Sequence, residues 1–127
     1  MLLGLRTIIY PAPRLEPTKA WFTETLGVGP YFDEPFYVGY NIGGYELGLD
    51  PNADVAQGPV TYWGVAMVED AVAHFVSRGA TVKEEAHEVG DGIKVATVIL
   101  PQSTVAFGLI ENPHFELRPE PTDGPGV

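Results

Sequence analysis

Few side chains of this chain could act as an acid, a base, a nucleophile or a metal ligand. The 127 residues include no cysteine, which excludes disulfides, thiolate zinc sites and a cysteine nucleophile. The three histidines are His74, His87 and His114. We expect His74 on the solvent side of a helix and His114 in a polar tail. His87 lies on a predicted strand, where a pocket role and a surface role both stay open.

Glu46 is the carboxylate best placed for chemistry. It lies on a predicted strand over residues 45–49, in which alternate side chains share one face of the sheet. Leu47 and Leu49 would pack against a helix, so Glu46 and Gly48 would face the opposite way. Glu46 could then accept a hydrogen bond from a positively charged group or act as a general base with a raised pKa.

The common catalytic and phosphate-binding motifs are absent from the sequence. It contains no glycine-rich phosphate loop, no GxSxG elbow and no HExxH pair. Gly43-Gly44 and Gly90-Asp91-Gly92 suit hairpin turns rather than phosphate cradles. The acidic run at Glu84, Glu85 and Glu88 is typical of a solvated strand edge.

The elements that must position these side chains occur twice in the same order. We expect a strand, a helix and three strands at residues 5–10, 14–26, 30–33, 36–42 and 45–49, and again at 60–68, 69–79, 81–89, 93–100 and 104–110. Leu47-Gly48-Leu49 resembles Phe107-Gly108-Leu109, sixty positions later. The sequence therefore predicts a single domain over 1–127. It would consist of a first βαβββ module at 5–50, a linker at 51–59, a second module at 60–111 and a loosely held, proline-rich acidic tail at 112–127.

Composition narrows the function classes. Hydrophobic residues make up 45% of the chain, enough for a core, and no stretch approaches the roughly 18–20 apolar residues that span a bilayer. The start shows no signal-peptide pattern, so we expect a cytoplasmic protein. A net charge of −10, from 17 acids against 7 bases, argues against nucleic acid and anionic membranes as partners. The same charge favours a cationic ligand, although acidity for solubility alone is the simpler explanation.

Three segments resemble the vicinal oxygen chelate superfamily, which includes glyoxalase I, bleomycin-resistance proteins and extradiol dioxygenases. They are Ala20–Gly27, Val68–Ala71 followed by Ser77–Ala80, and Phe107–Pro113. The resemblance implies an α+β fold in which two βαβββ modules form a curved mixed sheet around a shared pocket. It does not settle function, because this fold carries several activities.

Metal-dependent relatives hold a divalent ion with His, Gln or Glu from the first and last strand of each module. Matching the motifs places these positions at Thr7, Trp63, Gly48 and Gly108, none of which is a credible ligand. The resemblance therefore implies a metal-free site, and no cofactor is predicted. A zinc, nickel, manganese or iron site built from Thr7, Glu46 and His87 is the alternative.

Aromatic residues are dense where the resemblance places the pocket. Trp63 would stand at an inward position in place of a metal ligand, where its ring could stack on a planar ligand or attract a cation. Tyrosine hydroxyls would supply the polar anchors of a mostly apolar pocket. The predicted ligand-binding residues are Thr7, Tyr37, Glu46, Tyr62, Trp63 and His87.

Three functions remain open from the sequence. The favoured one is a metal-free protein that binds a small planar or cationic molecule, such as an antibiotic or a metabolite. The second is a glyoxalase-related lyase, isomerase or dioxygenase with an atypical metal centre or with Glu46 as general base. The third is an accessory domain that binds other proteins through its acidic tail. Exposed strand edges and the resemblance favour a homodimer.

Overall fold

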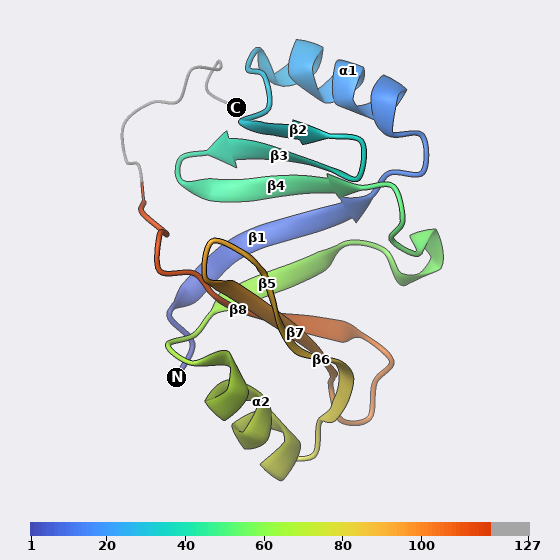
Figure 1. Cartoon of the computed structure of the whole chain (residues 1–127). Coiled ribbons are helices and arrows are strands. Elements are labelled where there is room, and N and C mark those ends of the chain that lie inside the picture. The colour runs from blue at the N-terminus through green and yellow to red at the C-terminus, as the bar shows by residue number, and fades with distance from the viewer. Residues whose placement is uncertain (118–127) are drawn as a thin grey trace. The chain divides into compact units, whose positions relative to one another are not determined.

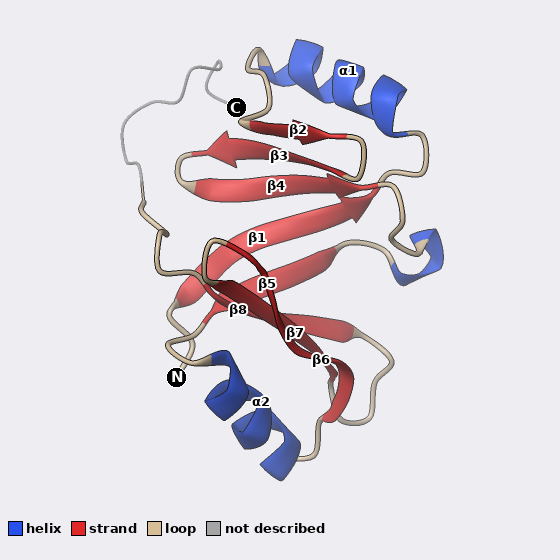
Figure 2. Cartoon of the chain, viewed as in Figure 1, coloured by secondary structure: helices blue, strands red, loops and turns tan. Residues whose placement is uncertain are grey.

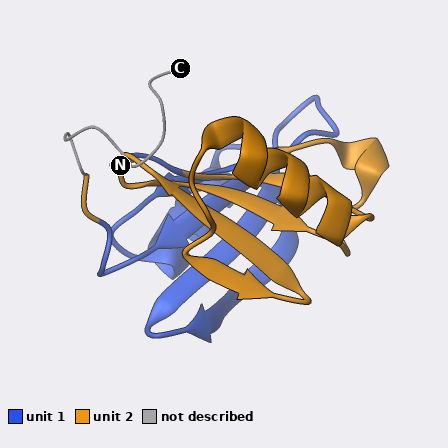
Figure 3. Ribbon diagram, turned by 90° about the horizontal axis from the view of Figure 1, so that it is seen from above, with its two compact units in different colours: residues 1–6, 60–115 blue, residues 7–59, 116–127 orange. Residues whose placement is uncertain are grey.

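The computed structural model describes residues 1–117 (Figures 1 and 2). The elements are β1 (Gly4–Pro11), α1 (Leu15–Leu26), β2 (Phe32–Glu34), β3 (Tyr37–Ile42), β4 (Tyr45–Asp50), a 3-10 helix (Val55–Gln57), β5 (Val60–Gly64), α2 (Val68–Ser77), β6 (Thr81–Gly90), β7 (Ile93–Ile99) and β8 (Ala106–Glu111). They group into two compact units, coloured separately in Figure 3. Unit 1 contains Met1–Arg6 and Val60–Phe115, and unit 2 consists chiefly of Thr7–Pro59.

Unit 2 carries a four-stranded sheet in the order β2-β3-β4-β1. β1 runs parallel to β4, whereas β4 pairs with β3, and β3 with β2, in antiparallel fashion. Helix α1 packs on one face, where Leu15, Val38, Tyr40 and Leu49 are buried together. Gly27 ends the helix in the left-handed conformation, with φ of 74°, which glycine adopts without strain.

Unit 1 repeats this arrangement with β5-β8-β7-β6. β5 runs parallel to β8, and the other neighbours are antiparallel. Helix α2 covers one face with Val68 and Ala71, which lie in the same core as Val98 and Leu109. The two sheets therefore have the same strand order and the same pairing, which confirms the predicted α+β class and its repeated βαβββ module.

Most of the predicted local features are found. Positive φ angles of 62° and 96° at Gly43 and Gly44 make the turn between β3 and β4, and Gly92 has φ of 76° in the turn between β6 and β7. β6 is an edge strand whose acidic residues are exposed, as predicted. The predicted strand over 60–68 is too long, because β5 ends at Gly64 and α2 already begins at Val68.

The start of the predicted tail is held more firmly than the sequence suggested. The His114 Nε2 lies 2.8 Å from the backbone oxygen of Asp91, and the Arg6 guanidinium lies 3.7 Å from the centre of the Phe115 ring. A cation over a ring face is attracted by the electron density of the ring. The prediction of a loose tail from residue 112 is therefore wrong for residues 112–115, and residues 118–127 lie outside the described part. No described helix is long and apolar enough to cross a membrane.

Candidate functional site

Each sheet has one face covered by the helix of its own unit and one face turned away from that helix, here called the far face. In unit 2 the strand register assigns side chains to these faces. Thr7 pairs with Glu46, and Gly39 pairs with Gly48. Leu49 lies in the core beneath α1, and Glu46 is three residues away along the same strand, so its side chain projects from the far face. The predicted orientation of Glu46 agrees with this register.

The Glu46 carboxylate is held by two phenols. Oε1 accepts a hydrogen bond of 2.8 Å from the Tyr37 hydroxyl, and Oε2 accepts one from the Tyr31 hydroxyl. Glu46 and Tyr37 are half-buried. Hydrogen bonds to an ionised carboxylate are stronger than those between neutral groups, so the two phenols fix the position of the carboxylate. We name these three residues the Glu46 cluster.

Two glycines create the space in which the Glu46 cluster forms. A Cβ at Gly39 would lie 2.7 Å from the Glu46 Oε2 and 3.1 Å from the Tyr31 Cε1. A Cβ at Gly48 would overlap the Tyr37 hydroxyl and lie 2.6 Å from its Cζ. All of these distances are shorter than the separation at which nonbonded atoms pack without overlap. The absence of a side chain at these positions is therefore what lets the phenols reach the carboxylate.

The pKa of the Tyr31 hydroxyl is raised far above its ordinary value. Burial of the hydroxyl contributes most, followed by the hydrogen bond to Glu46 and the charge of that carboxylate. The tyrosine as a whole is nevertheless 62% exposed. The ring edge therefore lies in solvent while the hydroxyl is turned into the sheet, and Tyr31 stays a neutral hydrogen-bond donor at physiological pH.

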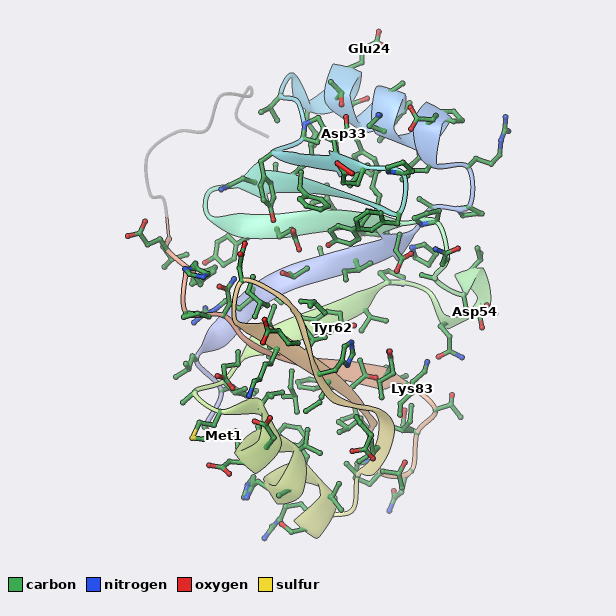
Figure 4. All side chains as sticks on the ribbon, viewed as in Figure 1. Met1, Glu24, Asp33, Asp54, Tyr62 and Lys83 are labelled. Carbon is green, nitrogen blue, oxygen red and sulfur yellow. The ribbon has the colours of Figure 1, made fainter. Side chains whose placement is uncertain are left out.

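The far face of unit 1 has a different content. Tyr62 pairs with Gly108, and a Cβ on that glycine would lie 2.6 Å from the Tyr62 Cγ, so the ring of Tyr62 lies over the glycine. Tyr62 projects from β5 in Figure 4. On the neighbouring strand β7, Thr97 also pairs with Gly108 and is buried. Its hydroxyl lies 3.4 Å from the Glu84 Oε1. His87 pairs with Val95 on the same face and is exposed.

Trp63 does not lie where the sequence placed it. It pairs with Leu109, a core residue beneath α2, and its ring stacks on Phe107 with centroids 6.0 Å apart. Phe107 in turn stacks on Phe75 of α2. Trp63 therefore faces the helix, and its prediction as an inward, ligand-stacking residue is wrong in orientation.

The source of this error is a shift in matching the two modules. In unit 2 Ile9 pairs with Gly48, and in unit 1 Tyr62 pairs with Gly108, so Tyr62 corresponds to Ile9. Counting two residues back along both strands, Thr7 corresponds to Val60 rather than to Trp63. An odd shift moves a side chain to the other face of the strand.

The structure thus distributes the predicted ligand-binding residues among three places. Thr7, Tyr37 and Glu46 lie together on the far face of unit 2. Tyr62 and His87 lie on the far face of unit 1, and Trp63 lies beneath α2. The set of Thr7, Glu46 and His87 as metal ligands stays a prediction.

Tyr31 was missed as a member of the site. It comes before the three-residue strand β2, and no alternation pattern assigns a side chain outside a strand to a face. The signal that could have found it is Gly39, whose backbone oxygen accepts a hydrogen bond of 2.9 Å from the Tyr31 amide. A glycine inside a strand marks a place that another group approaches closely.

No family model and no curated protein matches the sequence. Solved structures do match. A variant of Streptomyces coelicolor methylmalonyl-CoA epimerase, in complex with 2-nitronate-propionyl-CoA, aligns with 91% of this chain and 99% of its own, at 18% identity and a TM-score of 0.70. A glyoxalase/bleomycin resistance protein/dioxygenase superfamily member from Vibrio splendidus 12B01 aligns with 84% of this chain and 97% of its own, at 15% identity and a TM-score of 0.62.

The chain has the glyoxalase/bleomycin resistance/dioxygenase fold. This confirms, at the level of the fold, the resemblance to the vicinal oxygen chelate superfamily. A structure described as an NAD-dependent benzaldehyde dehydrogenase from Legionella pneumophila also aligns, with 82% of this chain and 96% of its own, at 11% identity and a TM-score of 0.65. Names this different on one fold mean that function must be argued from the side chains.

Proposed function

We propose that the protein binds a small planar cation on the far face of unit 2, with Glu46 as the anchoring carboxylate. The observation that carries this proposal is the pair of phenol hydrogen bonds that hold Glu46 in one position. A carboxylate that is already oriented loses little further freedom when a ligand arrives, which favours affinity. The net charge of −10 would raise the local concentration of a cation.

Aromatic rings beside the Glu46 cluster support a planar ligand. Phe32 lies 6.0 Å from Phe36 and 6.2 Å from Tyr37, measured between ring centroids. Phe32 and Phe36 are 39% and 59% exposed, so their surfaces are available for contact. A flat cation can place its ring against such surfaces while its charged group faces the carboxylate.

The residues of this sheet do not fit the divalent metal that the resemblance implies for other members. Glu46 is the only carboxylate of the cluster, and its register partner is the hydroxyl-bearing Thr7. Within the described chain, no three His, Asp or Glu side chains come together as a metal-ligand group. Three or four hard oxygen or imidazole donors are needed to hold zinc, nickel, manganese or iron. The proposal therefore uses no metal.

Calorimetric titration with benzamidine, a planar aryl cation, tests the proposal. We expect the wild type to bind benzamidine and to ignore benzoate, and we expect Glu46→Gln to lose at least tenfold in affinity. Glu24→Gln is the matched control, because it removes the same charge from an exposed position on α1 (Figure 4). Equal affinity of the wild type and Glu46→Gln for benzamidine would contradict the proposal.

A second function is favoured by one feature of the same cluster. A half-buried carboxylate can accept a proton from an acidic C–H bond, and a phenol that leaves the carboxylate could then donate to the substrate oxygen that gains charge. Glu46 would then act as the general base of an isomerase or lyase. Deuterium uptake at the α-carbon of acetophenone, followed by NMR in D2O, tests this function. We expect uptake with the wild type and none with Glu46→Gln, and no uptake with either protein removes the enzyme hypothesis.

A further inference from the structure

We infer that Tyr31 is the specificity-determining residue of the Glu46 cluster, because it holds the carboxylate oxygen that a ligand must take over. This inference rests on the proposed function and adds the chemical class of the ligand. A ligand that displaces Tyr31 has to bring its own hydrogen-bond donor. The site would therefore select planar cations that carry N–H groups over planar cations that carry none.

The two phenols of the cluster are held very differently. Tyr37 is half-buried, belongs to β3 and lies against Gly48 on the neighbouring strand. Tyr31 is 62% exposed and lies outside any strand, before the three-residue edge strand β2. Turning Tyr37 away would disturb the packed middle of the sheet. Turning Tyr31 away removes little surface from contact. The Tyr31 hydroxyl is therefore the one that a ligand would displace from Glu46.

The backbone around Tyr31 lets its side chain move alone. The Tyr31 amide donates to the backbone oxygen of Gly39, and this bond of 2.9 Å does not involve the side chain. Rotation about χ1 would leave the amide bond in place and vacate the space above Gly39. That space now holds the edge of a phenol ring, 3.1 Å from where a Cβ on Gly39 would lie. A flat ring with a donor at its end fits the space that Tyr31 leaves.

The hydrogen-bond balance sets the selectivity. While Tyr31 is in place, both oxygens of Glu46 are paired. A ligand without a donor that pushes Tyr31 aside leaves Oε2 unpaired in a half-buried place, which costs more than the net gain of an ordinary hydrogen bond. Benzamidine carries N–H donors and phenyltrimethylammonium carries none, although both are aryl cations. We expect the wild type to prefer benzamidine by at least about tenfold.

Titration of these two probes against four variants tests the inference. Tyr31→Phe removes the internal competitor and keeps the ring, so benzamidine affinity should rise about threefold to tenfold. Tyr37→Phe removes the phenol that positions the carboxylate, so affinity should fall or stay the same. Glu46→Gln should abolish the preference for benzamidine. Tyr45→Phe is the matched control, because Tyr45 lies one residue before Glu46 on β4 and points to the opposite face of the sheet.

The outcomes separate the inference from the proposed function. If Glu46→Gln loses binding while Tyr31→Phe binds benzamidine no better than the wild type, the inference is overturned and the proposed function stands. Equal binding of the two probes by the wild type likewise overturns the inference alone. If benzamidine binds neither the wild type nor Tyr31→Phe, both fall together. Binding by Tyr31→Phe alone would show that Tyr31 blocks the carboxylate, and it would overturn the proposed function of the wild-type protein.

Discussion

The far faces of the two units share a backbone plan and differ in chemistry. In both sheets a glycine at the same register position, Gly48 or Gly108, is covered by a tyrosine ring. The covering tyrosine is Tyr37 of β3 in unit 2 and Tyr62 of β5 in unit 1. The carboxylates differ more. Glu46 lies on the inner strand β4, whereas Glu84 lies on the exposed edge strand β6.

This difference teaches how a repeated fold acquires one site rather than two. A carboxylate on an inner strand has neighbours on both sides, and Glu46 accepts hydrogen bonds from two phenols there. Glu84 has strand β7 on one side only, where the Thr97 hydroxyl lies 3.4 Å away at the limit of hydrogen bonding. An edge carboxylate that water can solvate has no fixed position. It is therefore not oriented in advance for a ligand and binds one less tightly. The chemistry of unit 2 therefore comes from the strand that carries the acid, not from the fold.

The largest expected effect distinguishes the two glycines. In Gly108→Ala the new Cβ would meet the root of the Tyr62 ring and, at 2.7 Å, the backbone oxygen of Thr61. The backbone of a paired strand cannot shift to relieve this overlap, so we expect a loss of about 3 kcal/mol in the free energy of unfolding. In Gly48→Ala the Cβ would meet only the far end of the Tyr37 side chain, and a side chain can shift at a smaller cost than backbone. We expect a loss of only about 1–2 kcal/mol there, together with weaker benzamidine binding.

Urea denaturation of both variants measures this ranking. Gly29→Ala is the control, because no atom lies within 4 Å of a Cβ at that position. A larger loss for Gly48→Ala than for Gly108→Ala would mean that Tyr37 is as immovable as the sheet itself. The comparison of the two far faces would then need revision.

The next effect tests the helix-facing sides of β1 and β5. Trp63 and Tyr10 occupy corresponding places, because they pair with Leu109 and Leu49. Trp63 stacks on Phe107, whereas Tyr10 is 38% exposed. We expect Trp63→Ala to lower the free energy of unfolding by about 2–3 kcal/mol and Tyr10→Ala by about half as much. Trp63→Ala should leave benzamidine affinity unchanged. A tenfold loss of affinity in a folded Trp63→Ala protein would restore the tryptophan as a ligand contact.

A smaller effect concerns the two helices. The first amide of α2 at Val68 donates to the Glu111 Oε1 over 3.0 Å, so a residue of β8 supplies the cap that Met67 lacks. Helix α1 has no side-chain cap at Arg14. We expect Glu111→Ala to cost about 1 kcal/mol in chemical denaturation, and Glu85→Ala on the exposed strand β6 to cost almost nothing. Equal stability of the two variants would show that α2 needs no cap from β8.

The repeat was predictable from the sequence, and the full content of the site was not. The order of elements follows from local signals. These are the turn glycines, the apolar periodicity of the helices and the similarity of the segments around Gly48 and Gly108. The face of Glu46 followed from strand alternation. Trp63 was misplaced because motif matching tolerates a shift of three residues, whereas the face of a strand residue does not. Only the strand register, which is a contact between distant segments, resolves such a shift.

Tyr31 escaped prediction for a related reason. Its role depends on a hydroxyl that reaches across β3 to Glu46 on β4, over the bare backbone of Gly39. The sequence shows that Gly39 lies inside a predicted strand, but it does not show which side chain uses the space above it. The tail contacts of His114 and Phe115 were missed likewise, because their partners Asp91 and Arg6 are distant in sequence.

The smallest expected effect is the alkaline titration of Tyr31, which tests the cluster without any ligand. The pKa of Tyr31 is raised in the folded protein, by burial first and then by Glu46, so its neutral form is favoured by folding. The stabilising contribution is complete below the ordinary tyrosine pKa of about 10 and is lost as pH rises toward the raised value. Ultraviolet titration should show one phenol that ionises late in the wild type and is missing in Tyr31→Phe. In Glu46→Gln this phenol should ionise earlier but still late, because burial remains when the carboxylate charge is gone. If the titration of Glu46→Gln superimposes on that of the wild type, the carboxylate does not act on Tyr31, and the chemical difference between the two far faces loses its main support.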